Sequence, residues 1–575
     1  MAARGGGPWA RFDGVAWLSR PLALTLAALA SAMAGAATLG SCALDWPPPL
    51  QPDAGTPDAG DEGDAADADG EAPSDCERCP AVAAYARPDA PAAGATHQVP
   101  SGGDLQAALE AAAPGDEILL EPGGVYSGGL TLPLKDGDAF ITVRSSAASS
   151  LPGPCTRIGP AHFADLPKIV ATPGEPAVLA ADGAHHYRFV AVELTIDASA
   201  APQPYGVVMI GLGTETDAAL LPHHIELDRV WIHGDPRGSS RHGLVANGGS
   251  TLLVNSWVSE IKSEADFMNA VAAWNGPGPL VVVNSHLESA GQMVNVGGQP
   301  PSIAGTVPSD VVVGWCDLVR PRAWDPDDPS WDGSAWRAGG AVDLVNARRV
   351  TIEGNHIEHV WQFQTFRLQP QPDTGEPWGV VQDVTIAANE VRAVEAGFAM
   401  RGGTSSDPRR HTRQVTVRDN LMPDLGQGGS DGRIFAVIGG VDDLVITHNT
   451  ILQTARISYA DGTSAGFVFQ DNIVNHGDYG IFCEAIGLGT PCLEAMFPGY
   501  EMRRNVIVGI PGSYSPSDYP PDNFFPAYEV GFIDPAGGDY RLGDGTPYQG
   551  KATDGDDVGV HIDLHDAAAA CRTAR

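Results

Sequence analysis

The chain repeats one short pattern of apolar and polar positions. Residues 350–360 read VTIEGNHIEHV, and nearly the same phrase returns as VTIAANEVRAV from Val384, VTVRDNLMPDL from Val415 and LVITHNTIL from Leu444. Apolar and polar residues alternate on both sides of each asparagine, which is the two-residue period of a β-strand. Each phrase therefore predicts a strand, a bend and a second strand.

The spacing of these asparagines predicts a solenoid rather than hairpins. Successive members are 34, 31, 29, 23 and 33 residues apart: Asn355, Asn389, Asn420, Asn449, Asn472 and Asn505. This is the length of one coil with variable loops, and an asparagine at the bend can hydrogen-bond its equivalent one coil away. Earlier segments such as TLLVNSWVSEI and PLVVVNSHLESA fit the same frame, with these residues at the corner: Val230, Ser256, Ser285 and Cys316.

The start of the repeat region predicts a cap. Leu105 to Ala112 has apolar residues at helical spacing, and a turn at residues 114–116 leads into a strand at Glu117 to Leu120. A short helix here would cover the open end of a strand stack. We expect an all-β chain: a single-stranded right-handed parallel β-helix over residues 96–565, with a short N-terminal capping helix and a C-terminal tail at 566–575.

The first residues have the pattern of an export signal. Arg4, Arg11 and Arg20 precede an apolar run rich in small residues, which ends in Leu-Gly-Ser-Cys at residues 39–42. This tetrapeptide resembles a bacterial lipobox. We expect a lipoprotein signal peptide at residues 1–41, a lipidated Cys42, and a chain held at the outer membrane or cell surface by its lipid alone. An ordinary signal peptide with an incidental cysteine is the alternative.

Charge and composition extend this prediction. Residues 51–75 carry nine acidic and no basic side chains, so we expect an acidic disordered tether over residues 42–95. The whole chain has 34 basic and 71 acidic side chains, a net charge of −37, which argues against a nucleic-acid partner. Its 70 glycines and 47 prolines argue against a helical protein.

The cysteines fit an oxidising compartment. Cys483 and Cys492 flank a short loop and predict a local disulfide. Cys76 and Cys79 form a single CxxC without nearby histidines, which favours a structural disulfide over a zinc or redox site. The sequence leaves the pairing of the remaining cysteines open: Cys155, Cys316 and Cys571.

Several segments together resemble a known family. AVAAWNGPGPLVVVNSHLESAGQMVNVGG from Ala270 and AVDLVNARRVTIEGNHIEHVW from Ala341 are similar to a large family of secreted bacterial right-handed β-helix repeat proteins. The resemblance covers most of residues 97–565 and implies a fold similar to that of pectate lyases and related polysaccharide-active proteins. It also implies a polysaccharide partner, and we expect a monomer. One departure is Val345, which stands where the family pattern has a lysine.

Outward side chains of the predicted strands form a first candidate site. If Val294, Leu344, Phe366 and Met400 point inward, alternation places two outward columns on successive coils. The first column holds Asn295, Asp343 and Arg367, and the second holds Trp274, Gln369 and Arg401. We assign catalysis to Asp343 and Arg367 and substrate binding to Asn295, Trp274, Gln369 and Arg401. The alternative is a solvated surface with an Asp343–Arg367 ion pair, and a loop-anchoring role for Trp274.

A second group of charged residues lies in the loop SEIKSEADF. Glu264 and Asp266 could hold Ca²⁺ through oxygen ligands, and Lys262 could take the proton α to a uronate carboxylate in a β-elimination. A hydrolase would instead pair Asp343 with Asp266 or Glu288. Ordinary solvated loop charges are the alternative. Two functions remain open: a polysaccharide lyase or glycoside hydrolase, and a non-catalytic glycan-binding or adhesive surface protein.

Overall fold

The computed structural model describes residues 75–87, 93–197, 199, 202–370, 379–403, 412–426 and 432–573. The predicted signal peptide, Cys42 and the acidic run at 51–74 lie outside these residues. Among the described residues, no helix is both long enough and apolar enough to cross a bilayer.

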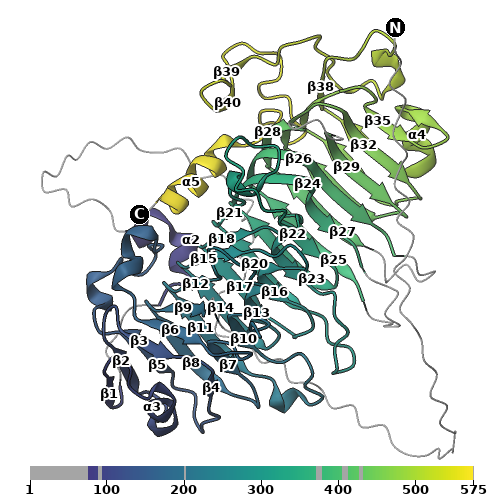
Figure 1. Ribbon diagram of the computed structural model, residues 1–575. Helices are drawn as coiled ribbons and strands as arrows, with labels where there is room; N and C mark the ends of the chain where they lie inside the picture. The colour runs from purple at the N-terminus through teal and green to yellow at the C-terminus, as the bar shows by residue number, and fades with distance from the viewer. Residues whose placement is uncertain are drawn as a thin grey trace, which may run out of the picture. The chain divides into compact units, whose positions relative to one another are not determined.

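Each coil of the chain contributes up to three strands, and equivalent strands of successive coils pair in parallel to form three faces (Figure 1). The first face is a sheet of these strands: β1 (Thr96–Val99), β2 (Glu117–Leu120), β5 (Ile141–Ser145), β8 (His185–Val190), β11 (His223–Asp228), β14 (Gly249–Val254), β17 (Leu280–Val283), β20 (Ser309–Gly314), β23 (Ala347–Glu353), β25 (Val381–Ala387), β27 (Arg413–Arg418), β30 (Asp442–Thr447), β33 (Val468–Gln470) and β37 (Glu501–Arg503).

The second face follows the asparagine corner. It contains β3 (Val125–Ser127), β6 (Lys168–Ala171), β9 (Glu193–Ile196), β12 (Trp231–His233), β15 (Trp257–Ile261), β18 (His286–Ser289), β21 (Asp317–Val319), the first halves of β24 (His356–Leu368) and β26 (Glu390–Arg401), β28 (Leu421–Leu425), β31 (Thr450–Gln453), β34 (Ile473–Asn475) and β38 (Val506–Val508).

The third face completes each coil. It contains β4 (Leu130–Leu132), β7 (Val178–Ala180), β10 (Val208–Ile210), β13 (His242–Ala246), β16 (Asn269–Ala273), β19 (Gln292–Val296), β22 (Val342–Leu344), the second halves of β24 and β26, β29 (Arg433–Ile438), β32 (Arg456–Asp461) and β35 (Ile481–Cys483), to which β36 (Gly487–Leu488) adds antiparallel. The predicted right-handed parallel β-helix is confirmed.

The interior is a continuous apolar stack. One core cluster runs from Val99 to Tyr519, and inward side chains of equivalent strands lie one above the other within it. The rings of Phe366, Phe398 and Phe435 stack along the axis with centroids 4.9 and 5.0 Å apart. Stacking of like residues lets each coil bury its apolar face only against its neighbours, so the coils fold together.

The corner between the first and second faces holds the predicted ladder. The backbone N–H and the side-chain amide of Asn389 both donate to Oδ1 of Asn420, and Asn355 donates to Asn389 in the same way. Earlier coils use shorter side chains at this corner, where Val230 N–H donates to Ser256 Oγ at 3.1 Å and Ser256 N–H donates to Ser285 Oγ at 3.1 Å. The corner prediction is therefore confirmed over both halves of the chain.

The N-terminal end of the stack has the predicted cap. Helix α3 (Leu105–Ala111) begins after Asp104, whose carboxylate accepts the N–H of Ala107 at 2.9 Å. Leu105 and Leu109 are buried in the main core, so this amphipathic helix covers the first strands. At the other end, α4 (Thr490–Met496) begins within the loop closed by the predicted Cys483–Cys492 disulfide. Beyond α4 the strands β39 (Phe532–Asp534) and β40 (Asp539–Leu542) pair antiparallel.

Both ends of the described chain pack on the first face, which changes two predicted boundaries. Helices α1 (Asp75–Arg78) and α2 (Pro80–Ala83) lie inside the range predicted as tether, and α5 (Ile562–Thr573) replaces the predicted tail. Disulfides join Cys76 to Cys155 and Cys79 to Cys571, while Cys316 is free and buried at the corner. The outward side chains of β14, β17 and β20 are apolar, and the terminal segments cover them: Leu252, Val254, Val281, Val283 and Val312.

Candidate functional site

The third face carries the first predicted column in register. Asn295 on β19 is paired with Asp343 on β22, and Asp343 is paired with Arg367 on β24. The three side chains therefore occupy equivalent positions on successive coils, as the alternation predicted. Coils in a parallel sheet are ~4.8 Å apart, so neighbouring members can interact directly.

Asp343 is buried beneath this face and holds Arg367. Its side chain is 2% exposed against 33% for Arg367, and one carboxylate oxygen accepts from both the guanidinium and the Nε2 of Gln292, the latter at 3.0 Å. Burial raises the pKa of the Asp343 carboxyl, while the charge and hydrogen bond of Arg367 and the amide of Gln292 oppose the rise. Asp343 thus positions Arg367 rather than facing solvent itself.

A chain of amides supports the pair from the preceding coils. Asn269 on β16 is in register with Gln292, and its Nδ2 donates to Oε1 of Gln292 at 3.0 Å. Gln292 in turn donates to Asp343, so the same carboxylate oxygen is held by Gln292 from the preceding coil and by Arg367 from the following one. Among the described residues, Arg367 Nε and Asn295 Oδ1 have no hydrogen-bond partner. Both atoms are buried, so neither is exposed to a polar group placed on this face.

The second predicted column lies at the C-terminal ends of the same strands. Trp274 follows β16, and its N–H donates to Oδ1 of Asn247 at 2.9 Å. Gln369 follows β24 and donates its N–H to Leu344 O at 2.9 Å, while Arg401 ends β26 and is exposed. The backbone of Trp274 is thus anchored, as the alternative interpretation stated, and its half-buried ring still borders the face.

An aromatic and histidine group beside Trp274 was missed by the sequence analysis. The Trp274 ring lies edge-on to His242 at 4.9 Å, and Tyr205 lies 4.9 Å from His242 and beneath the guanidinium of Arg241 at 4.6 Å. Burial lowers the pKa of His242 to about 3, so its imidazole is neutral, and its Nδ1 has no partner among the described residues. His242 begins β13 in register with Asn269, whereas Tyr205 lies in a loop that no periodic pattern marks.

Further arginines follow Arg367 along this face. In the column of Arg367 the next two coils carry small side chains, Ala399 and Ala436. Arg433 and Arg456 are in register with each other at the starts of β29 and β32. Arg401 ends β26, on the coil between Arg367 and Arg433.

Lys262, which we predicted to be catalytic, is packed elsewhere. It is buried, forms an ion pair with Glu260, and donates to Pro236 O at 2.9 Å. Its ammonium group lies over the rings of Trp324 at 4.9 Å and Trp336 at 5.3 Å. None of its contacts among the described residues involves Asp343 or Arg367, so it does not share a site with them.

The two predicted calcium ligands contact different partners. Asp266 lies 3.7 Å from the guanidinium of Arg241, and the exposed Glu264 accepts the N–H of Ala335 at 3.4 Å. The calcium site therefore stays a prediction without a preformed ligand group. The alternative acid, Glu288, lies on β18 of the second face, away from the strand of Asp343. Val345, at the family's lysine position, is buried.

A cleft at the corner between the second and third faces was also not predicted. It has a volume of about 240 Å³ and is formed where the insert after β21 covers the middle of β24. Arg322 Nε lies 2.8 Å from Nε2 of His359 at this cleft. The other polar lining residues are acidic: Asp325, Asp327, Asp328 and Glu395. The cleft depends on how the insert folds, which the strand pattern does not specify.

Comparison with known proteins finds likeness in fold. No protein-family model matches the chain, and no curated protein matches it. Among solved structures, the chain is similar to an alginate lyase from Paenibacillus sp. at 12% identity and a TM-score of 0.36, covering 64% of this chain and 97% of that one. A mannuronic-acid-specific polysaccharide family 6 lyase from human gut microbiota is similar at 9% identity and a TM-score of 0.44, covering 75% and 91%.

A pectate lyase is similar at 12% identity and a TM-score of 0.34, covering 81% of this chain and 96% of that one. Likeness in fold to pectate lyases was predicted, and a pectate lyase is among the structures that the chain is similar to. At these identities the likeness concerns the fold alone, and function has to be argued from side chains.

Proposed function

We propose that this chain recognises an acidic polysaccharide along its third face, with the guanidinium of Arg367 as the central contact. The observation that carries the proposal is the support of that guanidinium: Asp343 and Gln292, both buried, fix a cation that is itself one-third exposed. A fixed planar guanidinium can bind a carboxylate through two parallel hydrogen bonds. The half-buried Asn295, in register two coils away, can donate its side-chain N–H to a sugar hydroxyl.

The cost of the buried carboxylate favours this function over a merely solvated face. A buried ion pair contributes little net stability compared with apolar residues of similar size, because both charges lose their hydration. A strand that only has to be soluble needs no buried Asp343 and no Gln292 and Asn269 behind it. These buried groups have a clear role if they hold the guanidinium of Arg367 rigid at the surface.

The distribution of arginines supports an acidic ligand. A net charge of −37 repels a polyanion at long range, so binding requires a local excess of cations. On the coils that follow Arg367, the exposed Arg401 adds a cation, and Arg433 and Arg456 lie on the next two coils. Ala399, next to Arg367 in its column, is small and partly exposed and leaves room for a sugar ring against the strand.

Cleavage by β-elimination is the second candidate, favoured by the group around His242. A base removes the proton α to the uronate carboxyl group, its electron pair forms a carbon–carbon double bond, and the bond to the leaving glycosidic oxygen breaks, after which that oxygen takes up a proton. His242 is buried together with its unpartnered Nδ1, so this neutral imidazole accepts the first proton only if the site opens, whereas the exposed Tyr205 could donate the second. Asn269 and Arg241 lie beside them as polar groups for the carboxylate.

Binding is tested by titrating the parent and two variants with polyuronate chains and with a neutral glucan. Arg367→Ala should weaken polyuronate binding about 10- to 100-fold, since it removes a charge-assisted hydrogen bond. Arg144→Ala is the matched control, because Arg144 on β5 of the first face is 29% exposed and also paired with a carboxylate, that of Glu117. Equal affinities of all three proteins, or preference for the neutral glucan, would contradict the proposal.

Cleavage is tested on the same polyuronates by the absorbance of the unsaturated product. Tyr205→Phe should remove turnover and leave binding nearly intact, because the hydroxyl group acts only in the reaction. If the parent binds a polyuronate and forms no unsaturated product, the chain is a binding protein and the β-elimination candidate is rejected. Addition of a chelator in the same assay tests the predicted Ca²⁺ dependence.

A further inference from the structure

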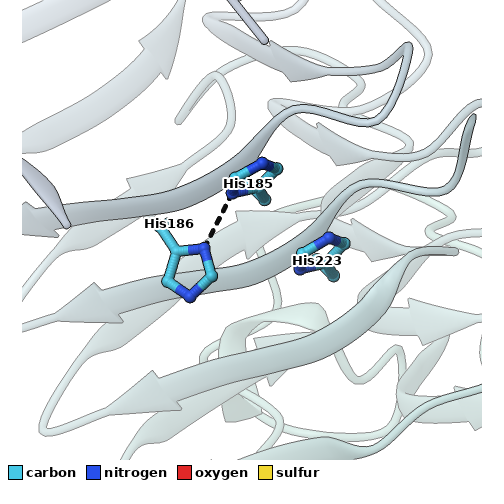
Figure 2. A group of neighbouring side chains, drawn as sticks. All are labelled: His185, His186 and His223. Carbon is cyan, nitrogen blue, oxygen red and sulfur yellow. Dashed lines mark hydrogen bonds between the residues drawn. The ribbon is translucent and has the colours of Figure 1, made fainter. Parts of the chain in front are cut away.

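Two adjacent coils begin their first-face strands with a pair of histidines. His185 and His186 begin β8, and His223 and His224 begin β11. The two strands are neighbours in the sheet, and His223 is in register with His185 (Figure 2). The four imidazoles therefore meet at one place on the surface, at the end of the first face where each coil enters it from the third.

The ring nitrogens of this cluster face one another. Nδ1 of His185 lies 2.7 Å from Nδ1 of His186, and the equivalent distance between His223 and His224 is 2.6 Å. The His185 and His223 rings are stacked with centroids 4.8 Å apart, as are the His186 and His224 rings at 4.4 Å. One nitrogen from each of His185, His186 and His223 lies within 4.8 Å of the other two.

The backbone explains why consecutive histidines can meet. In a regular strand, neighbouring side chains point to opposite faces. His186 and His224 have left-handed φ values of 58° and 55°, which break that alternation. The same bend recurs in later coils at Asp310 and Arg349, so it belongs to the fold. In these two coils both positions at the bend carry an imidazole.

We propose that His185, His186 and His223, with His224 beside them, form a binding site for a divalent transition-metal ion, with Zn²⁺ as the reference ion. Imidazole nitrogens prefer Zn²⁺, Cu²⁺ and Ni²⁺, whereas Ca²⁺ and Mg²⁺ prefer oxygen ligands. Ligand nitrogens about 2.0 Å from Zn²⁺ in a tetrahedral site are about 3.3 Å from each other, and the observed separations lie on both sides of that value.

Metal binding requires only a small change in the cluster. The contact within each pair uses one proton between two Nδ1 atoms, so one ring donates and the other accepts. Moving that proton to Nε2 of the same ring keeps the ring neutral and leaves a lone pair on each Nδ1 for the metal. Small rotations of the side chains then open the shortest separations toward the tetrahedral value. The ion would link two successive coils near the N-terminal end of the β-helix.

The test is calorimetric titration of the chelator-treated full chain with Zn²⁺ and, separately, with Ca²⁺. We expect about one Zn²⁺ per chain, no measurable Ca²⁺ binding at this site, and a higher unfolding temperature with Zn²⁺, because an ion that binds the folded state stabilises it. With Cu²⁺, the electron paramagnetic resonance spectrum should show coupling to several imidazole nitrogens. No Zn²⁺ binding by the parent would overturn the proposal.

Variants assign the ion to this cluster. His185→Gln and the double variant His185→Gln/His223→Gln should weaken Zn²⁺ binding at least about tenfold, as expected when a ligand is removed. The control is His561→Gln, because His448, Asp554 and His561 form the second group of closely spaced ligand atoms among the described residues. Zn²⁺ binding that is lost in His561→Gln and kept in the double variant would place the ion at the C-terminal group and refute the proposal. The single variant His185→Gln decides the matter if the double variant does not fold.

Discussion

Replacing Asn389 by leucine should destabilise the β-helix more than any single exposed substitution. Asn389 is fully buried, and its amide takes part in four hydrogen bonds. Nδ2 donates to Ile352 O and to Asn420 Oδ1, both at 2.9 Å, while Oδ1 accepts the backbone N–H of Asn355 at 3.1 Å and its Nδ2 at 2.9 Å. Leucine has nearly the same size and makes none of these bonds.

The size of the expected loss of stability follows from the buried polar groups that lose their hydrogen-bond partner. The backbone N–H of Asn355 loses its acceptor, and one N–H of its side chain does too, since the other donates to Val313 O. Each unpaired buried polar group costs about 1–3 kcal/mol, and the apolar leucine side chain recovers part of that sum. We expect the free energy of unfolding to fall by about 2–4 kcal/mol.

The assay is guanidinium unfolding followed by circular dichroism, with two comparison variants. Asn475→Leu is the matched control, because Asn475 is half-buried and its Nδ2 makes one hydrogen bond, to Gln453 O at 3.1 Å, so we expect a loss below about 1 kcal/mol. Asn389→Ser should fall between the two leucine variants, since Ser256 and Ser285 accept backbone N–H groups at this same corner. An unchanged midpoint for Asn389→Leu would refute the role of the ladder.

Three further predictions concern the ends, the pH dependence and the location of the chain. Replacing Cys79 removes the disulfide to Cys571, which closes a loop spanning 492 residues, and should lower the free energy of unfolding by about 2–5 kcal/mol. The unfolding temperature of the oxidised variant should then approach that of the reduced protein. Burial disfavours the charged form of His356, but hydrogen bonds to the carboxylates of Glu358 and Glu390 outweigh burial and raise the pKa of His356 from 6.5 to about 9. The protonated His356 should therefore contribute its full stabilisation below pH 6.5, and this stabilisation should disappear as the pH rises to 9. His356→Gln should flatten that part of the stability profile, and a profile as steep as the parent's would contradict the assignment. Cys42→Ala should move the protein from the membrane to the soluble fraction, and retention in the membrane would exclude lipidation as the anchor.

The repeat of the fold was readable because one residue type marks each coil. Asn355 and its successors occur at the bend in every coil of the C-terminal half, and strand alternation fixes the register between them. The same frame then located Ser256, Ser285 and Cys316, although serine and cysteine alone would not identify a corner. The helices at the two ends were not predicted, because Cys79 pairs with Cys571 far away in the sequence and no local pattern reports such a pairing.

The site was predictable only where strands define it. Alternation correctly placed Asn295, Asp343 and Arg367 in one column, because that depends on the backbone period alone. It did not predict that Asp343 is buried, since that follows from Gln292, which reaches it from the start of the neighbouring strand. The sequence did not show that Lys262 packs against Trp324 and Trp336, because the insert that carries these tryptophans has no periodic pattern from which its fold could be predicted.

The most direct test of the central claim is the structure of this protein with a bound polyuronate oligosaccharide. The account predicts that the sugar chain lies on the third face across β19, β22 and β24, with one carboxylate against the guanidinium of Arg367 and a hydroxyl group within hydrogen-bond distance of Asn295. An oligosaccharide found instead in the cleft beside Arg322 and His359, or on the first face, with Arg367 still bound only to Asp343, would contradict it.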